Sequence, residues 1–208
     1  MAVAGTLANE SPTPGTATAW SGGREAARTR LRALAWPVVL ALTGLAAAAP
    51  LWSSALLPFQ DGPQHLASVR VIADYHAPGL GFDRWFVLDL RRLEYLGFYL
   101  PAAALAKWIG TDAATRVLLS LIALALPAAT WMLLGAFGRD RRLAVFAPAL
   151  FHTTPLYLGF FNFVASVPAL IAAVALTERE LRAPSPRRAV ALALLAVALI
   201  WLHPSALA

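Results

Sequence analysis

The longest run without a formal charge covers 35 residues, from Leu143 to Thr177. It exceeds the roughly 20 residues that one α-helix needs to cross the hydrocarbon of a bilayer. The sequence His152-Thr153-Thr154-Pro155 interrupts the run near its middle, as a polar turn closed by proline does. The run therefore predicts two membrane-spanning helices joined by a turn.

Three further apolar stretches are candidates for membrane spans. Ala33 to Gln60 and Val117 to Gly138 carry no charge, and neither does the stretch from Ala189 to Ala208. Only 13% of all residues are charged, whereas soluble domains carry about 25%. We therefore predict an all-α fold, a polytopic transmembrane helix bundle of about five spans. The spans are placed at about 33–57, 114–137, 143–155, 157–177 and 188–208.

Basic residues predict the orientation of these spans. Residues 1–32 are expected to form a disordered cytoplasmic tail whose basic end contains Arg24 and Arg32, and residues 33–208 form the transmembrane domain. The outer loop is then 58–113, with juxtamembrane helices. Within it, 95–109 either spans the membrane or lies in the interface, and only the second choice keeps every later arginine cluster inside. A cleaved signal peptide is the alternative reading of the first span.

Composition excludes several function classes. The chain has no cysteine, which rules out disulfides, thiolate chemistry and cysteine-based zinc sites. Its net charge of +6 comes almost entirely from arginine, because Lys107 is the only lysine. In a membrane protein this charge reports topology and contact with lipid headgroups, and no nucleic-acid-binding pattern is present. The Ala- and Arg-rich usage suggests a bacterial chain, hence a multi-pass protein of the inner membrane.

Several features follow one another in a suggestive order. An acidic residue lies just beyond the first span, in Phe59-Gln60-Asp61-Gly62-Pro63-Gln64-His65-Leu66-Ala67. An aromatic, proline-containing stretch begins at Tyr95 and ends in Lys107-Trp108-Ile109-Gly110, and Ala113-Ala114-Thr115-Arg116 opens the next span. A basic turn, a short span, a proline-containing turn and the polar residue Asn162 complete the series.

Over about residues 30–208, this order resembles the N-terminal part of the GT-C superfamily of membrane glycosyltransferases. That superfamily includes the protein mannosyltransferases and bacterial enzymes that use polyprenyl-phosphate sugars. The resemblance implies transfer of a sugar from such a carrier at the outer membrane face. Two departures stand out: Asn162 replaces the Asp of many relatives, and complete members have further spans and often a soluble outer domain.

Glycosyl transfer from a lipid phosphate needs a base, groups that hold the leaving phosphate, and a groove for the lipid. Asp61 is the candidate base, although Asp61-Gly62-Pro63 is also a good start for a helix. His65 lies one helical turn later, on the same face. It is an orienting residue, half of a metal site or a hydrogen-bonded interfacial histidine, so a divalent ion stays open as a cofactor and no metal ligands are assigned.

The other candidates are substrate-binding residues. Cations of the outer loop are candidates to bind the carrier phosphate, although exposed arginines beside interfacial helices more often meet lipid headgroups. Asn162 and His203 lie in or beside apolar runs, where polar side chains are costly and indicate either function or helix–helix hydrogen bonding. The full candidate set beyond Asp61 is His65, Arg70, Arg84, Arg91, Arg92, Lys107, Asn162 and His203.

Two other functions remain possible from the sequence. The alternative is a non-catalytic membrane subunit, or a partner that binds the lipid carrier alongside another membrane protein. A transporter normally has repeated halves with broken helices, and no repeat is evident. The expected partners are therefore membrane lipids, a polyprenyl-phosphate sugar and a membrane partner subunit, without nucleic acid.

Overall fold

The computed structural model describes residues 35–91 and 94–206. The chain separates into two units, Met1–Val38 and Val39–Ala208, and the second contains the pocket and the groove described below. The regular elements of the described ranges are all helices, which confirms the all-α prediction. The predicted cytoplasmic tail, residues 1–32, and Arg92 lie outside the described residues.

Three helices of the described ranges are long and apolar enough to cross a membrane: Ala35–Ser53, α6 (Thr111–Ala136) and α8 (Phe161–Arg182). The last turn of the first of them is α2 (Pro50–Ser53). At about 1.5 Å rise per residue, the 26 residues of α6 extend about 39 Å, enough for a bilayer core of about 30 Å. These apolar helices confirm the prediction of a membrane protein. The apolar helix α9 (Pro186–Leu202) is shorter, with 17 residues.

The predicted span at 143–155 has a different structure. Residues Arg141–Leu150 form the 3-10 helix η1, and Thr154–Leu158 form the short helix α7. Pro148 lies inside η1 and has no N–H to donate, and Pro155 lies in the first turn of α7. The described residues therefore contain three helices of membrane length, where the hydropathy pattern predicted about five spans.

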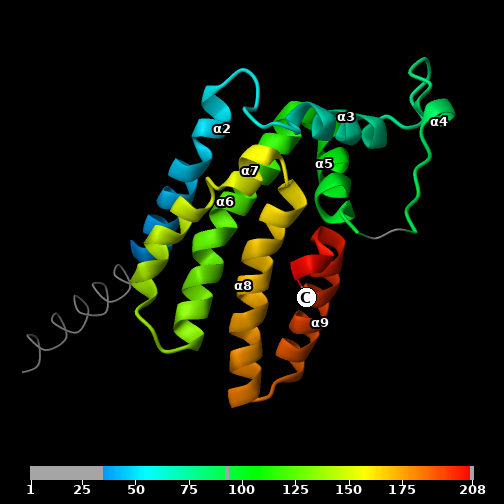
Figure 1. The fold of residues 1–208 in the computed structure, drawn as a ribbon. Coiled ribbons are helices and arrows are strands. Elements are labelled where there is room, and N and C mark those ends of the chain that lie inside the picture. Colours follow the sequence, from blue (N-terminus) through cyan, green and yellow to red (C-terminus); the bar gives the residue numbers. More distant parts are fainter. Residues whose placement is uncertain (1–34, 92–93, 207–208) are drawn as a thin grey trace, which may run out of the picture. The chain divides into compact units, whose positions relative to one another are not determined.

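Segment 58–113, which the sequence predicted as an outer loop, contains the shorter helices α3 (Gly62–Ala73), α4 (Phe82–Trp85) and α5 (Leu96–Ile109). The 14 residues of α5 extend only about 21 Å, so this apolar helix is too short to cross the bilayer alone. The sequence left 95–109 open between a span and an interfacial helix, and the length of α5 favours the interfacial helix. Helix α3 runs across the direction of α6 and α8 (Figure 1).

The core lies where α3, α5, α6 and α8 meet, and it is rich in aromatic residues. Phe98, Phe151 and Phe161 are almost completely buried there. Full burial of one such side chain stabilises a fold by about 1.5–3 kcal/mol. These contacts place the beginning of α5, the beginning of α8 and the middle of α3 in one neighbourhood.

Arg116 anchors the segment that leads into this neighbourhood. Its side chain is only 5% exposed, although it lies in α6. The guanidinium donates to the carbonyl of Leu51 and, at 3.0 Å, to the carbonyls of Ser54 and Ala55. It also pairs with Asp112 one turn earlier. Since the carbonyls at a helix end lack internal partners, Arg116 supplies them and holds the chain that continues toward Asp61.

Candidate functional site

The backbone around Asp61 is held by a segment about 100 residues later in the chain. The N–H of Gln60 donates to the carbonyl of Tyr157 at 2.9 Å, and that of Asp61 donates to the carbonyl of Leu158 at 3.4 Å. These two bonds join the end of the first loop segment to α7. They fix Asp61 at the point where α3 begins.

Asp61 occupies the N-cap position of α3, but its side chain makes no capping hydrogen bond. Its backbone carbonyl accepts from the N–H of His65 at 3.0 Å, as the first helical bond requires. The two roles predicted for Asp61, helix cap and base, are therefore separated: the backbone starts the helix while the half-buried carboxylate lines a pocket. The carboxylate is free of the capping bond that would have turned it away.

His65 contacts the Tyr99 hydroxyl and the backbone of Gly159. Its Nδ1 is hydrogen-bonded to the Tyr99 hydroxyl, and the two rings are stacked with centroids 5.7 Å apart. The backbone of Gly159 is its second partner. Burial lowers the pKa of His65, and the charge of Asp61 and the bond to Gly159 oppose that shift.

Tyr99 is the functional candidate that the sequence did not single out. It lies in α5 beside other aromatic residues, and no motif distinguishes it from them. Burial raises the pKa of Tyr99 to about 12, and the negative charge of Asp61 adds to the shift. At neutral pH the phenol is therefore protonated and remains available as a donor.

Asn162 connects the beginnings of two helices. It is the second residue of α8, and its side chain is 6% exposed. Its Oδ1 accepts from the backbone N–H of Phe98, the third residue of α5, at 3.1 Å. The first N–H groups of a helix lack internal partners, so Asn162 caps α5 from another helix.

His203 packs against residues at the starts of α5 and α8. It follows the last residue of α9, and its ring packs edge-on against Tyr95 and Phe163, with centroids 5.1 and 5.5 Å away. Its Nδ1 is 2.7 Å from the hydroxyl oxygen of Ser205. Tyr95 has a φ of 67°, an unusual conformation for a tyrosine, and this turn starts α5 at the site.

These side chains surround one pocket of about 210 Å³. Four of the residues proposed from the sequence, which come from three separate parts of the chain, meet in its wall: Asp61, His65, Asn162 and His203. Tyr95, Tyr99 and the aromatic residues Phe160, Phe161 and Phe163 complete it. The combination of a carboxylate, an imidazole and a protonated phenol can accept, hold and donate protons.

The predicted phosphate-binding cations are not in this wall. Arg70 pairs with Asp74 at 2.7 Å, and Arg91 pairs with Asp89 at 3.0 Å. Arg84 lies in α4, and Lys107 lies in the last turn of α5. Within the described ranges, none of these four lines the pocket that contains Asp61.

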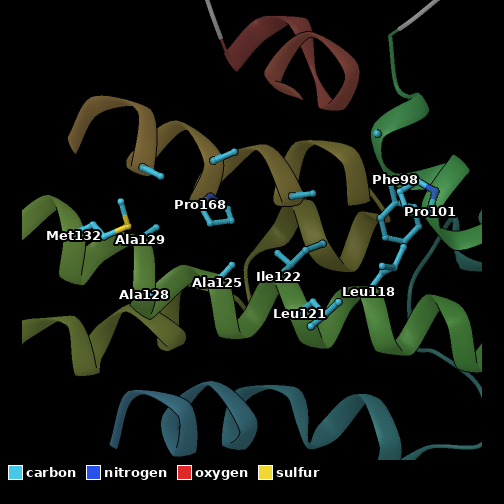
Figure 2. Close-up of a pocket in the computed structure, with 14 residues that line it drawn as sticks. Phe98, Pro101, Leu118, Leu121, Ile122, Ala125, Ala128, Ala129, Met132 and Pro168 are labelled. Atoms are coloured by element: carbon cyan, nitrogen blue, oxygen red, sulfur yellow. The ribbon is translucent and has the colours of Figure 1, made fainter. Parts of the chain in front are cut away.

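An apolar groove of about 440 Å³ lies beside the polar pocket, between α5, α6 and α8. Figure 2 shows Phe98, Pro101 and Leu118 at one end of the groove and Met132 at the other. All its lining residues are apolar or glycine. The groove and the pocket meet at the start of α5, because the backbone of Phe98 is bonded to Asn162.

A metal site is not evident from the geometry. No group of three or more His, Cys, Asp or Glu side chains arranged to hold a metal ion occurs among residues 35–91 and 94–206. Asp61 and His65 alone are two ligands, fewer than a structural or catalytic site for a divalent ion normally has.

Comparison of the chain with models of known protein families, with curated proteins and with solved structures finds no match.

Proposed function

We propose that this chain is a GT-C-type glycosyltransferase, or the N-terminal part of one, that uses a polyprenyl-phosphate sugar. The observation that carries the proposal is the placement of Asp61. Its uncapped carboxylate faces a pocket with His65 and Tyr99, and an apolar groove begins next to that pocket. A lipid-linked sugar needs two adjacent sites: an apolar groove for its isoprenoid chain and a polar pocket for its sugar.

In the proposed reaction, Asp61 is the general base. The acceptor hydroxyl attacks the anomeric carbon, and its proton passes to the Asp61 carboxylate. The bond between that carbon and the phosphate oxygen breaks, and its electron pair leaves with the polyprenyl phosphate. His65 orients Tyr99, whose protonated hydroxyl donates a hydrogen bond within the pocket. Arg70, Arg84, Arg91, Arg92 and Lys107 remain predicted partners of the phosphate.

The proposed site is at the outer face of the bacterial inner membrane. The turn between α6 and η1 contains Arg139 and is followed by Arg141 and Arg142, and the turn between α8 and α9 is followed by Arg187 and Arg188. Both turns lie at the same end of the helices, opposite α3 and α7 (Figure 1). Because positive loops stay in the cytoplasm, this arrangement supports an external position for Asp61 and a cytoplasmic N-terminus.

The test is Asp61→Asn in the full chain, reconstituted in liposomes with undecaprenyl phosphate carrying a tritiated hexose or pentose. Membranes of the producing cells supply the acceptor, and loss of label from the lipid extract measures transfer. The matched control is Asp83→Asn, because Asp83 is an exposed acid of the same loop. We expect Asp61→Asn to abolish transfer and the control to retain it. Full activity of a normally inserted Asp61→Asn protein would remove Asp61 from the mechanism.

A second function, a carrier-binding membrane subunit without its own catalysis, is favoured by one observation. Asn162 replaces the expected Asp, and its Oδ1 is occupied by the cap of α5. Both proposals require a lipid in the apolar groove. Ala125→Phe, which fills that groove, should weaken binding of undecaprenyl phosphate, and Val190→Phe on exposed α9 is the control. Carrier binding by the purified chain without any sugar transfer would select this second function.

A further inference from the structure

The segment between α3 and α5 exposes an unusual amount of apolar surface. We name residues 80–91, which include α4, the outer arm. Trp85 is 82% exposed and Val87 is 92% exposed, and further exposed apolar side chains of the arm are Leu80, Phe86 and Leu90. Large apolar side chains exposed together in one short segment indicate a binding surface.

The arm touches the rest of the loop through Phe86. The Tyr75 hydroxyl, at the end of α3, donates to the Phe86 carbonyl at 2.7 Å, and the Phe86 N–H donates to the Phe82 carbonyl at 2.9 Å. Both backbone groups of Phe86 are therefore satisfied. The residues after Trp85 have no regular secondary structure as far as Leu90, so their remaining backbone groups need polar partners. This excludes deep burial in hydrocarbon and favours the hydrated headgroup region.

The charges of the arm cancel. Asp83 and Asp89 oppose Arg84 and Arg91, and Asp89 forms an ion pair with Arg91 at 3.0 Å. The arm therefore has no excess positive charge with which to bind anionic lipids or a negatively charged protein. Its aromatic and aliphatic side chains, flanked by arginines, have the composition of a segment that partitions into a membrane interface.

We propose that the outer arm inserts Trp85, Val87 and Leu90 into the headgroup region of the membrane that the helices cross, independently of lipid charge. The arm is covalently joined to membrane-length helices, so the bilayer is present at high effective concentration. Insertion fixes the far end of α3, whose near end contains Asp61 and His65, against the membrane surface. The proposal does not depend on the catalytic role of those residues.

Because the native chain has no cysteine, single labels can be introduced without a background. A nitroxide is placed at Val87→Cys or, as the control on the polar side of the same arm, at Asp83→Cys. Both positions are exposed, so neither change disturbs the core. The full chain is reconstituted in phosphatidylcholine alone and in phosphatidylcholine with phosphatidylglycerol. Collision of each label with oxygen and with a water-soluble nickel complex is measured by electron paramagnetic resonance.

We expect a several-fold higher ratio of oxygen to nickel collisions at position 87 than at position 83, equal in both lipid mixtures. A label at 87 that meets nickel as freely as one at 83 would place the arm in water and overturn the proposal. Shielding of position 87 from both reagents would show a protein partner instead of lipid. A strong dependence on phosphatidylglycerol would overturn insertion driven by apolar side chains.

Discussion

The Oδ1 of Asn162 accepts a hydrogen bond from the backbone N–H of Phe98 across 64 residues of sequence. The bond joins the first turn of α8 to the first turn of α5, between the polar pocket and the apolar groove. This hydrogen bond explains why the polar side chain of Asn162 is buried at the start of the apolar helix α8. Its loss would free the start of α5, which supplies Tyr95 and Tyr99 to the pocket wall.

Asn162→Ala is expected to lower the free energy of unfolding by about 1–2 kcal/mol, since it removes a cap and leaves a buried N–H without a partner. Asn162→Asp keeps an acceptor oxygen at the same place and should unfold close to the native temperature. Intrinsic tryptophan fluorescence during heating in detergent measures both. Equal losses in the two variants would mean that the hydrogen bond does not stabilise this junction.

Gly159→Ala is expected to distort the pocket. Gly159 has a φ of +98°, and an added Cβ would lie 3.0 Å from the Cβ of Asp61 and 3.2 Å from Nε2 of His65. Gly79 has a φ of +87° with open space around it, so Gly79→Ala carries the conformational cost without the crowding. We expect about 1–2 kcal/mol of destabilisation from Gly79→Ala, and about 1–3 kcal/mol more from Gly159→Ala. Identical unfolding temperatures for the two variants would show that the pocket accommodates the methyl group.

Arg116→Gln is expected to destabilise the protein by about 3 kcal/mol, because it removes a buried guanidinium that donates to three carbonyls and pairs with the exposed Asp112. Arg91→Gln breaks an exposed ion pair and should change stability by less than about 1 kcal/mol. Thermal unfolding of both variants in the same detergent makes the comparison. A small effect at Arg116 would imply that water replaces its guanidinium.

The stability of the protein should fall at acidic pH because of His65. Burial lowers its pKa below the usual 6.5, so the folded chain binds this proton less readily than the unfolded chain does. The stability that neutral, buried His65 contributes is fully present above about pH 6.5. It is lost as the pH falls toward the lowered pKa of this histidine. The groups facing the ring are Asp61 and Tyr99, whose phenol stays neutral in this range.

Melting temperatures between pH 7.5 and 5 test this effect, and His65→Gln should flatten the profile over that range. Asp61→Asn removes a charge that raises the pKa of His65, so the histidine should titrate at still lower pH. Nuclear magnetic resonance of labelled histidine follows that titration directly. A His65 signal that titrates at 6.5 in both proteins would contradict the burial argument.

The candidate site was partly predictable because some of its relationships are local. Asp61 and His65 are separated by one helical turn, so their shared face follows from spacing alone. Asn162 and His203 were indicated by polarity within apolar runs, a property of single positions. Tyr99 has no such signal, since its pairing with His65 depends on the packing of α5 against α3. The buried, multiply bonded state of Arg116 likewise requires a partner carbonyl from another helix.

Local chemistry was sufficient to predict a helical membrane protein, because hydrophobic length and charge placement act over one span at a time. The proline pattern also located the turn near 155, although the hydropathy of 143–155 predicted a span where η1 forms. Only the tertiary structure decided which polar residues meet. Contacts such as Asp61 with Leu158 and Phe98 with Asn162 join distant segments, and their formation depends on the packing of several helices together. The same packing left the loop arginines outside the pocket and placed the apolar groove beside it.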